Sequence, residues 1–254
     1  MDSTQVKLAI APLGWTNDDI PELGGDIPFE QCISEMALAG YTGSEVGNKY
    51  PEDPSELNDY LQIRGLQICN KWFSAYLISQ PIEEVVTSFR ADLHYLKALG
   101  AEVIGPSEQT RSCQGKPVSV FTEKPLFTND EFKRLTSGMN ELGKIARNEG
   151  LRLAYHHHMG TGIQTVEETE RFLNDTNPDD VSLLCDSGHF TFSGEDPAAA
   201  LEMFVSRVGH VHLKDVRTDR LAEARRRDLS FLDAVRNGVF TVPGDGDIDF
   251  VPLF

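Results

Sequence analysis

The sequence is poor in basic residues. Its 254 residues include 23 Lys and Arg against 40 Asp and Glu, which gives a formal net charge of −17. A nucleic-acid interface needs clustered Lys and Arg to displace counterions from phosphates, and an anionic membrane surface also attracts basic segments. We therefore expect neither nucleic acid nor membrane among the partners of this protein.

Long apolar runs are also missing. No run approaches the roughly 20 residues that cross a bilayer, and the apolar part of MDSTQVKLAIAPLG is too short for a signal peptide. With 40% hydrophobic and 25% charged residues, the composition is that of an ordinary globular protein. We expect a cytoplasmic location.

Several motifs that carry chemistry are absent. The four cysteines, Cys32, Cys69, Cys113 and Cys185, form no CxxC pair, so we expect reduced thiols and assign them no chemistry. The sequence contains no GxGxxG and no GxxxxGK[ST], which disfavours nicotinamide and P-loop chemistry. It also lacks the GxSxG motif of serine hydrolases.

Short apolar runs alternate with longer segments of helical periodicity. We expect strands at 6–12, 42–47, 66–73, 102–105, 151–158, 181–185 and 208–213. We expect helices at 28–39, 54–64, 82–99, 129–148, 165–173, 197–205 and 221–235, and a long loop at 107–128. Such alternation predicts parallel strands with helical crossovers, in an open doubly wound sheet or in a (β/α)8 barrel.

The positions of the polar residues favour the barrel. In five units the apolar run leads directly into polar residues: SEVGNK at 44, CNKWF at 69, HHHMGT at 156, CDSGH at 185 and HLKDVR at 212. A barrel gathers the carboxyl ends of all its strands on one rim, whereas an open sheet concentrates its site near one switch point. We therefore predict a TIM barrel with its site on this rim.

Six of the seven histidines lie between residues 156 and 212. Side-chain alternation places His156 and His158 on one face of their strand and His157 on the other. His210 and His212 likewise share a face of the seventh strand. Histidines beside carboxylates at strand ends are typical of metal sites.

Asp186 follows a buried apolar run, where an unpaired carboxylate is costly without a cation or hydrogen-bond partners. The ends of the fifth, sixth and seventh strands are therefore candidates to converge on one ion. Structural roles remain open for the same residues. They are a helix N-cap or buried ion pair for Asp186, core packing for His157 and packing beside the site for His210.

Neutral donors, carboxylates and cations also follow these strands. They are Glu45, Asn70, Lys71, His189, Lys214, Asp215 and Arg217. This mixture suits a polyhydroxylated substrate better than a phosphate.

Seven stretches of the sequence carry a resemblance to a known family. They are APLGWTNDDIPELGG at 11, FEQCISEMALAGYTGSEVGNKYPEDP at 29, RGLQICNKWFSAYL at 64, AYHHHMGTGIQT at 154, LLCDSGHFTFSGEDP at 183, VGHVHLKDV at 208 and GDGDIDF at 244. Together they resemble the inosose dehydratases of the xylose-isomerase-like superfamily. The resemblance implies a TIM barrel, a divalent metal (Mn²⁺ or Co²⁺), glutathione as a further cofactor, and removal of water from 2-keto-myo-inositol in inositol catabolism.

The resemblance also implies site residues. In the superfamily an acid on strand five, an Asp on strand six, a His on strand seven and a Glu on strand eight hold the ion. These positions match His156, Asp186 and His212, with histidine replacing the usual strand-five acid, so we expect these three to bind the metal. The substrate-binding His and Arg of the superfamily match His189 and Arg217.

We expect Asn70 and Lys71 to bind substrate as well. Lys214, His158 or Glu45 is expected to transfer protons, because a base must take the proton beside the polarised ketone and an acid must assist the departure of hydroxide. Purely structural ion pairs remain an alternative for Lys71, Lys214 and Glu45.

The family continues past GDGDIDF into an eighth strand with a final Glu ligand, whereas this sequence ends at Phe254. Residues 249–254 look like the start of a helix. We therefore expect a single barrel domain over 1–254 that lacks its eighth strand and last helix, with an exposed apolar seam between strands one and seven.

Two alternative functions use the same features. A ketose isomerase or epimerase would form the same enolate without loss of hydroxide, and a noncatalytic barrel would bind a sugar without turnover. In each case the partner is a small polyol ketone, and a homo-oligomer is compatible with the sequence.

Overall fold

The structure is a computed structural model that describes residues 7–254, so the first residue of the strand expected at 6–12 lies outside the described part. The main strands are β1 (Ala9–Ile10), β2 (Gly43–Glu45), β3 (Gln67–Asn70), β4 (Trp72–Ala75), β5 (Val103–Glu108), β6 (Arg152–His156), β7 (Val181–Asp186) and β8 (Val208–His212). They pair in parallel in the orders β1-β2-β3 and β4-β5-β6-β7-β8. Within each sheet, a strand thus pairs with the next along the chain, as in a TIM barrel.

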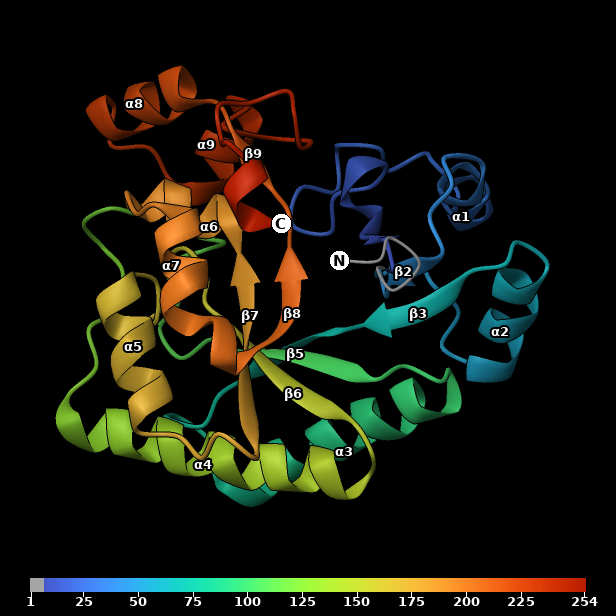
Figure 1. Cartoon of the computed structure of the whole chain (residues 1–254), viewed down its shortest axis with the longest axis horizontal. Helices are drawn as coiled ribbons and strands as arrows, with labels where there is room; N and C mark the ends of the chain where they lie inside the picture. Colours follow the sequence, from blue (N-terminus) through green and yellow to red (C-terminus); the bar gives the residue numbers. More distant parts are fainter. Residues whose placement is uncertain (1–6) are drawn as a thin grey trace.

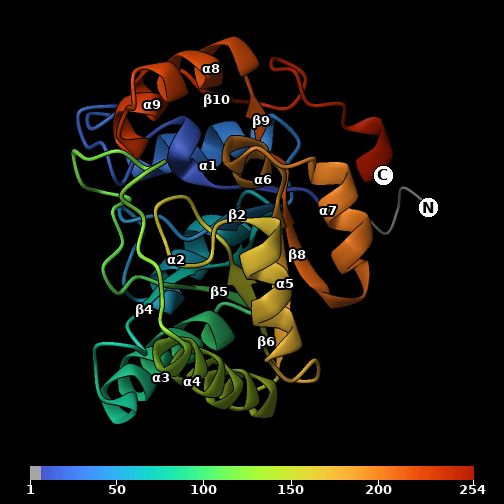
Figure 2. The same ribbon diagram turned by 90° about the vertical axis from the view of Figure 1, so that its left-hand side faces the viewer.

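Helices connect the strands and cover them from outside (Figures 1 and 2). They are α1 (Phe29–Leu38), α2 (Pro54–Gln62), α3 (Ile82–Ala98), α4 (Asn129–Asn148), α5 (Val166–Asn174), α6 (Ser187–Ser193), α7 (Pro197–Phe204), α8 (Thr218–Arg226) and α9 (Phe231–Arg236). Both figures place the long helices α3 and α4 along one side of the barrel, with α5 and α7 beside β7. The predicted TIM barrel is confirmed.

Local sequence signals explain the helix boundaries. Thr165 and Glu168 form the capping box that their spacing predicts, and Thr128 and Glu131 form a second one before α4. In α3, the buried residues recur with a period near 3.6 and face the strands; they are Val85, Phe89, Leu93 and Leu96. Capping and periodicity are local properties, so these boundaries lie close to the predicted ones.

Two predicted elements are divided in the structure. The strand expected at 66–73 is interrupted at Lys71, where β3 ends its pairing with β2 and β4 begins pairing with β5. The helix expected at 221–235 becomes α8 and α9, because Asp228 adopts a positive φ of 53° between them. The predictions of one unbroken strand and one unbroken helix were wrong, because apolar periodicity continues across a short interruption and does not reveal it.

Other elements were missed. The seven-residue helix α6 follows β7 directly, and β9 (Asp215–Val216) pairs antiparallel with β10 (Phe240–Thr241). Strand β5 extends to Glu108, so the long loop begins later than expected. At the end of the chain, the expected helix start is a single 3-10 turn over Val251–Leu253.

The outer edges of β1 and β8 have no strand partner within residues 7–254. Apolar side chains are exposed there: Leu8, just before β1, is 54% exposed, and Val211 of β8 is 45% exposed. The expected apolar seam stays a prediction. In the described part of the chain, no helix is long and apolar enough to cross a membrane.

Candidate metal centre and active site

The predicted metal ligands lie at the carboxyl ends of three adjacent strands. His156 ends β6, Asp186 ends β7 and His212 ends β8, and Asp186 and His212 are direct register partners. Figure 1 shows β7 and β8 side by side with their arrowheads at the same end. Parallel pairing therefore brings residues that are 56 positions apart in sequence, from His156 to His212, to one rim.

The geometry of the three side chains fits a divalent cation. The Oδ2 atom of Asp186 lies 3.5 Å from Nε2 of His156 and 3.4 Å from Nδ1 of His212. Ligand atoms about 2.1 Å from a tetrahedral ion lie roughly 3.4 Å from one another. Considering only residues 7–254, neither Asp186 Oδ2 nor His156 Nε2 has a hydrogen-bond partner, although both atoms are buried. Such atoms are normally satisfied, and a cation between them would do so.

Asp186 uses its two oxygens differently. Oδ1 accepts a hydrogen bond of 2.9 Å from the backbone N–H of His189 and so caps α6, while Oδ2 faces the cluster. The N-cap role that the sequence left open thus coexists with a ligand position. The aspartate is fully buried, which alone would raise its pKa, but the Lys214 ammonium, His189 and the nearby imidazoles of His156 and His212 hold the pKa well below its usual value.

Glu45 of β2 reaches the cluster from the other side of the barrel. Its Oε1 lies 2.7 Å from Nε2 of His212, 3.3 Å from Nε2 of His210 and 2.9 Å from Nδ2 of Asn70. Burial raises the pKa of Glu45, but the positive charge of His212 and the contacts with both histidines outweigh burial and hold the pKa of Glu45 well below its usual value. Burial lowers the pKa of His212, whereas the carboxylates of Glu45 and Asp186 raise it to about 9.

Lys214 and His189 form the next layer of the site. The Lys214 ammonium lies 3.2 Å from Oδ2 of Asp186 and 3.0 Å from Nε2 of His189. Burial, with the nearby positive charge of Lys214, holds the pKa of His189 well below its usual value, so a neutral His189 accepts a hydrogen bond from Lys214. The ring centroids of His158 and His189 lie 4.0 Å apart.

The three consecutive histidines have different partners. His157 turns away from the cluster, stacks 3.8 Å from Phe190 and accepts a hydrogen bond from the backbone N–H of Asp186. Core packing for His157 is therefore confirmed. His158 Nδ1 lies 3.0 Å from the carbonyl oxygen of Met159, so Nδ1 donates and Nε2 carries the lone pair. Burial lowers the pKa of all three histidines to about 3.

Other predicted residues are engaged elsewhere. Lys71 pairs with Asp92 of α3 on the outer side of the strands, because it follows the inward-facing Asn70 in the alternation. The ion pair fits the structural alternative for Lys71, and its contact with substrate stays a prediction. Arg217 bonds to the carbonyl oxygen of Gly238 at 2.8 Å and to Asp245 at 2.6 Å, and its contact with substrate stays a prediction.

Asp215 is a structural residue. It is fully buried and accepts hydrogen bonds from the backbone N–H groups of Gly244, Gly246 and Ile248. It thus folds the GDGD turn onto β9.

Sequence reasoning missed Trp72, the aromatic residue in CNKWF. Its ring centroid lies 5.5 Å from that of His156 and 5.4 Å from that of His158, both edge-on. Trp72 also lines a cavity of about 410 Å³ with polar walls. The other lining residues are Asp19, Ser74, Tyr76, Gln109, Ser112, Gln114, Gly115 and Lys116. The cavity thus adjoins the histidine cluster through one aromatic ring.

Comparison with known proteins decides the family. Residues 33–254 match the family described as xylose isomerase-like TIM barrel. The chain is 54% identical over 257 residues to an inosose dehydratase of Glaesserella parasuis serovar 5, covering all of this chain and 86% of that protein. It is 55% identical over 251 residues to the inosose dehydratase of Geobacillus thermodenitrificans, covering 98% and 84%. This chain belongs to the inosose dehydratase family.

Two solved structures are similar in fold to this member of the inosose dehydratase family. A probable 3-DHS dehydratase, AsbF of Bacillus anthracis, superposes with a TM-score of 0.72 at 14% identity, over 98% of this chain and 87% of that one. The crystal structure of the IOLI protein with a binding zinc atom superposes with a TM-score of 0.69 at 18% identity, over 98% and 83%.

Proposed function

We propose that this chain is a metal-dependent inosose dehydratase that removes water from 2-keto-myo-inositol. The observation that carries the proposal is the cluster of His156, Asp186 and His212. Asp186 Oδ2 lies 3.5 and 3.4 Å from the imidazole nitrogens of the two histidines, and two buried atoms of the cluster have no hydrogen-bond partner among the described residues. The identity of more than 50% to proteins named inosose dehydratase supports the choice of substrate.

The proposed ion is Mn²⁺ or Co²⁺, with glutathione as a further cofactor, as the family resemblance implies. Two imidazoles and one carboxylate also suit Zn²⁺, the ion that accompanies the IOLI protein in its crystal structure. When bound, the ion acts as a Lewis acid that polarises the ketone oxygen. We also propose a cytoplasmic location, and a homo-oligomer stays a prediction.

The proposed reaction is a β-elimination, and we assign its proton transfers to two side chains. His158 accepts the proton of the carbon beside the ketone at Nε2, because Met159 holds Nδ1 as the donor. The C–H electron pair forms a C=C bond, and the C–O bond to the next carbon breaks. Lys214 donates a proton to the departing hydroxide, which leaves as water. The enol that remains tautomerises to the trihydroxycyclohexane-1,2-dione.

Glu45 is assigned an orienting role in place of the proton transfer expected from the sequence. Oε1 of this carboxylate already accepts hydrogen bonds from His212 and Asn70, so it is not free to take a proton from the substrate. The same contacts hold His212 so that Nδ1 faces the ion position.

The cavity beside Trp72 is the proposed binding place of the polyol ring. Six-membered polyols present C–H faces to an aromatic ring and hydroxyl groups to polar walls. In the described part of the chain, the buried side-chain atoms Gln109 Nε2 and Gln114 Oε1 have no hydrogen-bond partner, so both can bond to hydroxyl groups.

The test is product analysis by mass spectrometry. Metal-free protein is incubated with 2-keto-myo-inositol, with and without Mn²⁺ or Co²⁺. We expect loss of one water from the substrate only with the ion. A product of unchanged mass would instead indicate an isomerase or epimerase, and ligand binding without conversion in the metal-loaded protein would indicate a binding module.

A further inference from the structure

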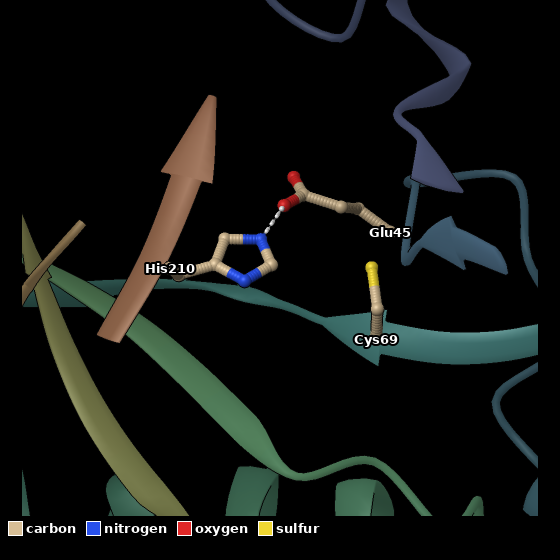
Figure 3. A group of neighbouring side chains, drawn as sticks. All are labelled: Glu45, Cys69 and His210. Atoms are coloured by element: carbon tan, nitrogen blue, oxygen red, sulfur yellow. Dashed lines mark ion pairs between the residues drawn. The ribbon is translucent and has the colours of Figure 1, made fainter. Parts of the chain in front are cut away.

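A second group of ligand side chains lies beside the cluster. Glu45 of β2, Cys69 of β3 and His210 of β8 each offer one ligand atom within 4.8 Å of the other two. Figure 3 shows the three side chains turned toward one another from three separate strands. The sequence predicted no metal contact for any of them.

The contacts of these side chains leave ligand atoms available. The Cys69 thiol contacts the carbonyl oxygen of Ser44 at 3.4 Å, a weak interaction for sulfur. His210 Nε2 lies 3.3 Å from Oε1 of Glu45, close to the roughly 3.4 Å that separates two ligands of one tetrahedral ion. The distance between these two atoms is thus closer to that between two ligands of one metal ion than to the length of a short hydrogen bond.

We propose that Glu45, Cys69 and His210 form a second divalent-cation site, suited to Zn²⁺ or Co²⁺. Thiolate, imidazole and carboxylate together select these borderline ions over Mg²⁺ and Ca²⁺, which take oxygen ligands. Three protein ligands leave a fourth position open for water or a small ligand, as at catalytic sites rather than structural ones. The side chains of Glu45 and His210 are 16% and 19% exposed, so the site is accessible.

The two sites share one residue. Oε1 of Glu45 lies 2.7 Å from Nε2 of His212, which belongs to the first cluster, and 3.3 Å from His210, which belongs to the second. An ion at the second site competes with His212 for this carboxylate. We therefore expect the second ion to bind more weakly than the first, and to displace the proton of the Cys69 thiol.

The experiment is a Co²⁺ titration of the metal-free full chain, followed by absorption and by metal analysis after dialysis. Cobalt bound to a thiolate shows a sulfur-to-cobalt charge-transfer band that nitrogen and oxygen ligands do not produce. We expect two ions per chain, with the band appearing as the second ion binds. Cys69→Ser should abolish the band and leave one ion, and His210→Gln should weaken the second ion at least about 10-fold.

Two matched variants control the assignment. Cys113→Ser removes a buried thiol that belongs to neither proposed metal site, so this variant should keep both ions and the charge-transfer band. Asp186→Asn should lose the first ion and retain the band. One ion per chain without a band, or a band that survives Cys69→Ser, would overturn the proposal. If circular dichroism shows that Cys69→Ser does not fold, His210→Gln, which keeps the thiol, tests the second site instead. Unchanged binding of the second ion in His210→Gln would also overturn the proposal.

The second site does not depend on the proposed activity. A charge-transfer band in a protein that fails to dehydrate the substrate would contradict the proposed function alone. Turnover in a protein without the band would contradict the second site alone.

Discussion

His212 and Glu45 meet across the barrel, with Nε2 of the histidine 2.7 Å from Oε1 of the carboxylate. Because a carboxylate only accepts, His212 donates from Nε2, and its Nδ1 remains directed at Asp186, 3.4 Å away. A carboxylate that fixes the tautomer of a metal-binding histidine is a common second layer of metal sites. The pair therefore links β2 to the candidate metal centre.

Replacing Glu45 tests this link. In a Cys69→Ser background, where only the first site remains, Glu45→Gln should weaken binding of the first ion by about 10–100-fold. In metal-free protein, the pKa of His212 should fall from about 9 because a negative charge is lost. Calorimetry and an imidazole NMR titration measure the two effects. Glu35→Gln, at an exposed position of α1, is the control, and an unchanged His212 pKa in Glu45→Gln would contradict the assignment.

Asp186 is the central ligand, so Asp186→Asn should remove the first ion. Turnover should fall by more than about 100-fold, since even outer partners of a metal site contribute 10–100-fold. Metal analysis and product formation at saturating Mn²⁺ test this expectation. Asp180→Asn is the matched control, because Asp180 directly precedes the opposite end of the same strand and pairs with Arg147. Full turnover in Asp186→Asn would exclude the proposed centre.

Lys214 neutralises the buried Asp186 in the absence of an ion. Lys214→Met should lower the free energy of unfolding of the metal-free protein by about 3 kcal/mol, because it removes the ion-pair partner of a buried carboxylate. Added Mn²⁺ should restore stability, because the ion supplies the missing positive charge, while turnover stays low. Denaturation with and without Mn²⁺ separates the two effects. Lys214→Arg should retain stability and lose most turnover, and normal turnover in Lys214→Met would remove the lysine from the reaction.

The neutral histidines predict a pH dependence of stability in metal-free protein. Burial lowers the pKa of His157 from 6.5 to about 3, so between these values the unfolded chain binds a proton that the folded chain does not. Stability is therefore lost as the pH falls from 6.5 toward 3, by about 1.4 kcal/mol per pH unit for this one histidine.

His157→Gln should reduce this slope by about that amount, because glutamine keeps an acceptor for the backbone N–H of Asp186 but does not titrate. Urea denaturation between about pH 4 and 6, within the window between the two pKa values, measures the slope in the presence of a chelator. His94→Gln, at an exposed position of α3, should leave it unchanged. An equal slope in His157→Gln and the unmodified protein would contradict burial of a neutral ring.

Trp72 connects the cavity to the histidines, so Trp72→Leu should raise KM for the polyol substrate by about 10-fold. This corresponds to about 1.4 kcal/mol of lost aromatic contact. Metal content should not change, because Trp72 offers no ligand atom. The control is Trp15→Leu, since Trp15 bonds to Glu35 on α1. A decrease in kcat larger than the increase in KM would indicate that Trp72 takes part in the chemical step and not only in substrate binding.

Much of the architecture was predictable from the sequence alone. The helix at 129–148 has the predicted boundaries, and the capping box of Thr165 and Glu168 is present. Polar residues after apolar runs predicted a rim site, and the structure brings His156, Asp186 and His212 together there. Burial, periodicity and capping depend on neighbours within a few residues, so the order of amino acids records them directly.

Only the tertiary structure decided which side chains meet. Glu45 and His212 are 167 positions apart, and their contact depends on how β2 and β8 lie across the barrel. The interruption at Lys71 turned that residue toward α3, and the approach of Cys69 to His210 joins strands distant in sequence. The tautomers and shifted pKa values have the same origin, because they follow from burial and from charges contributed by other strands.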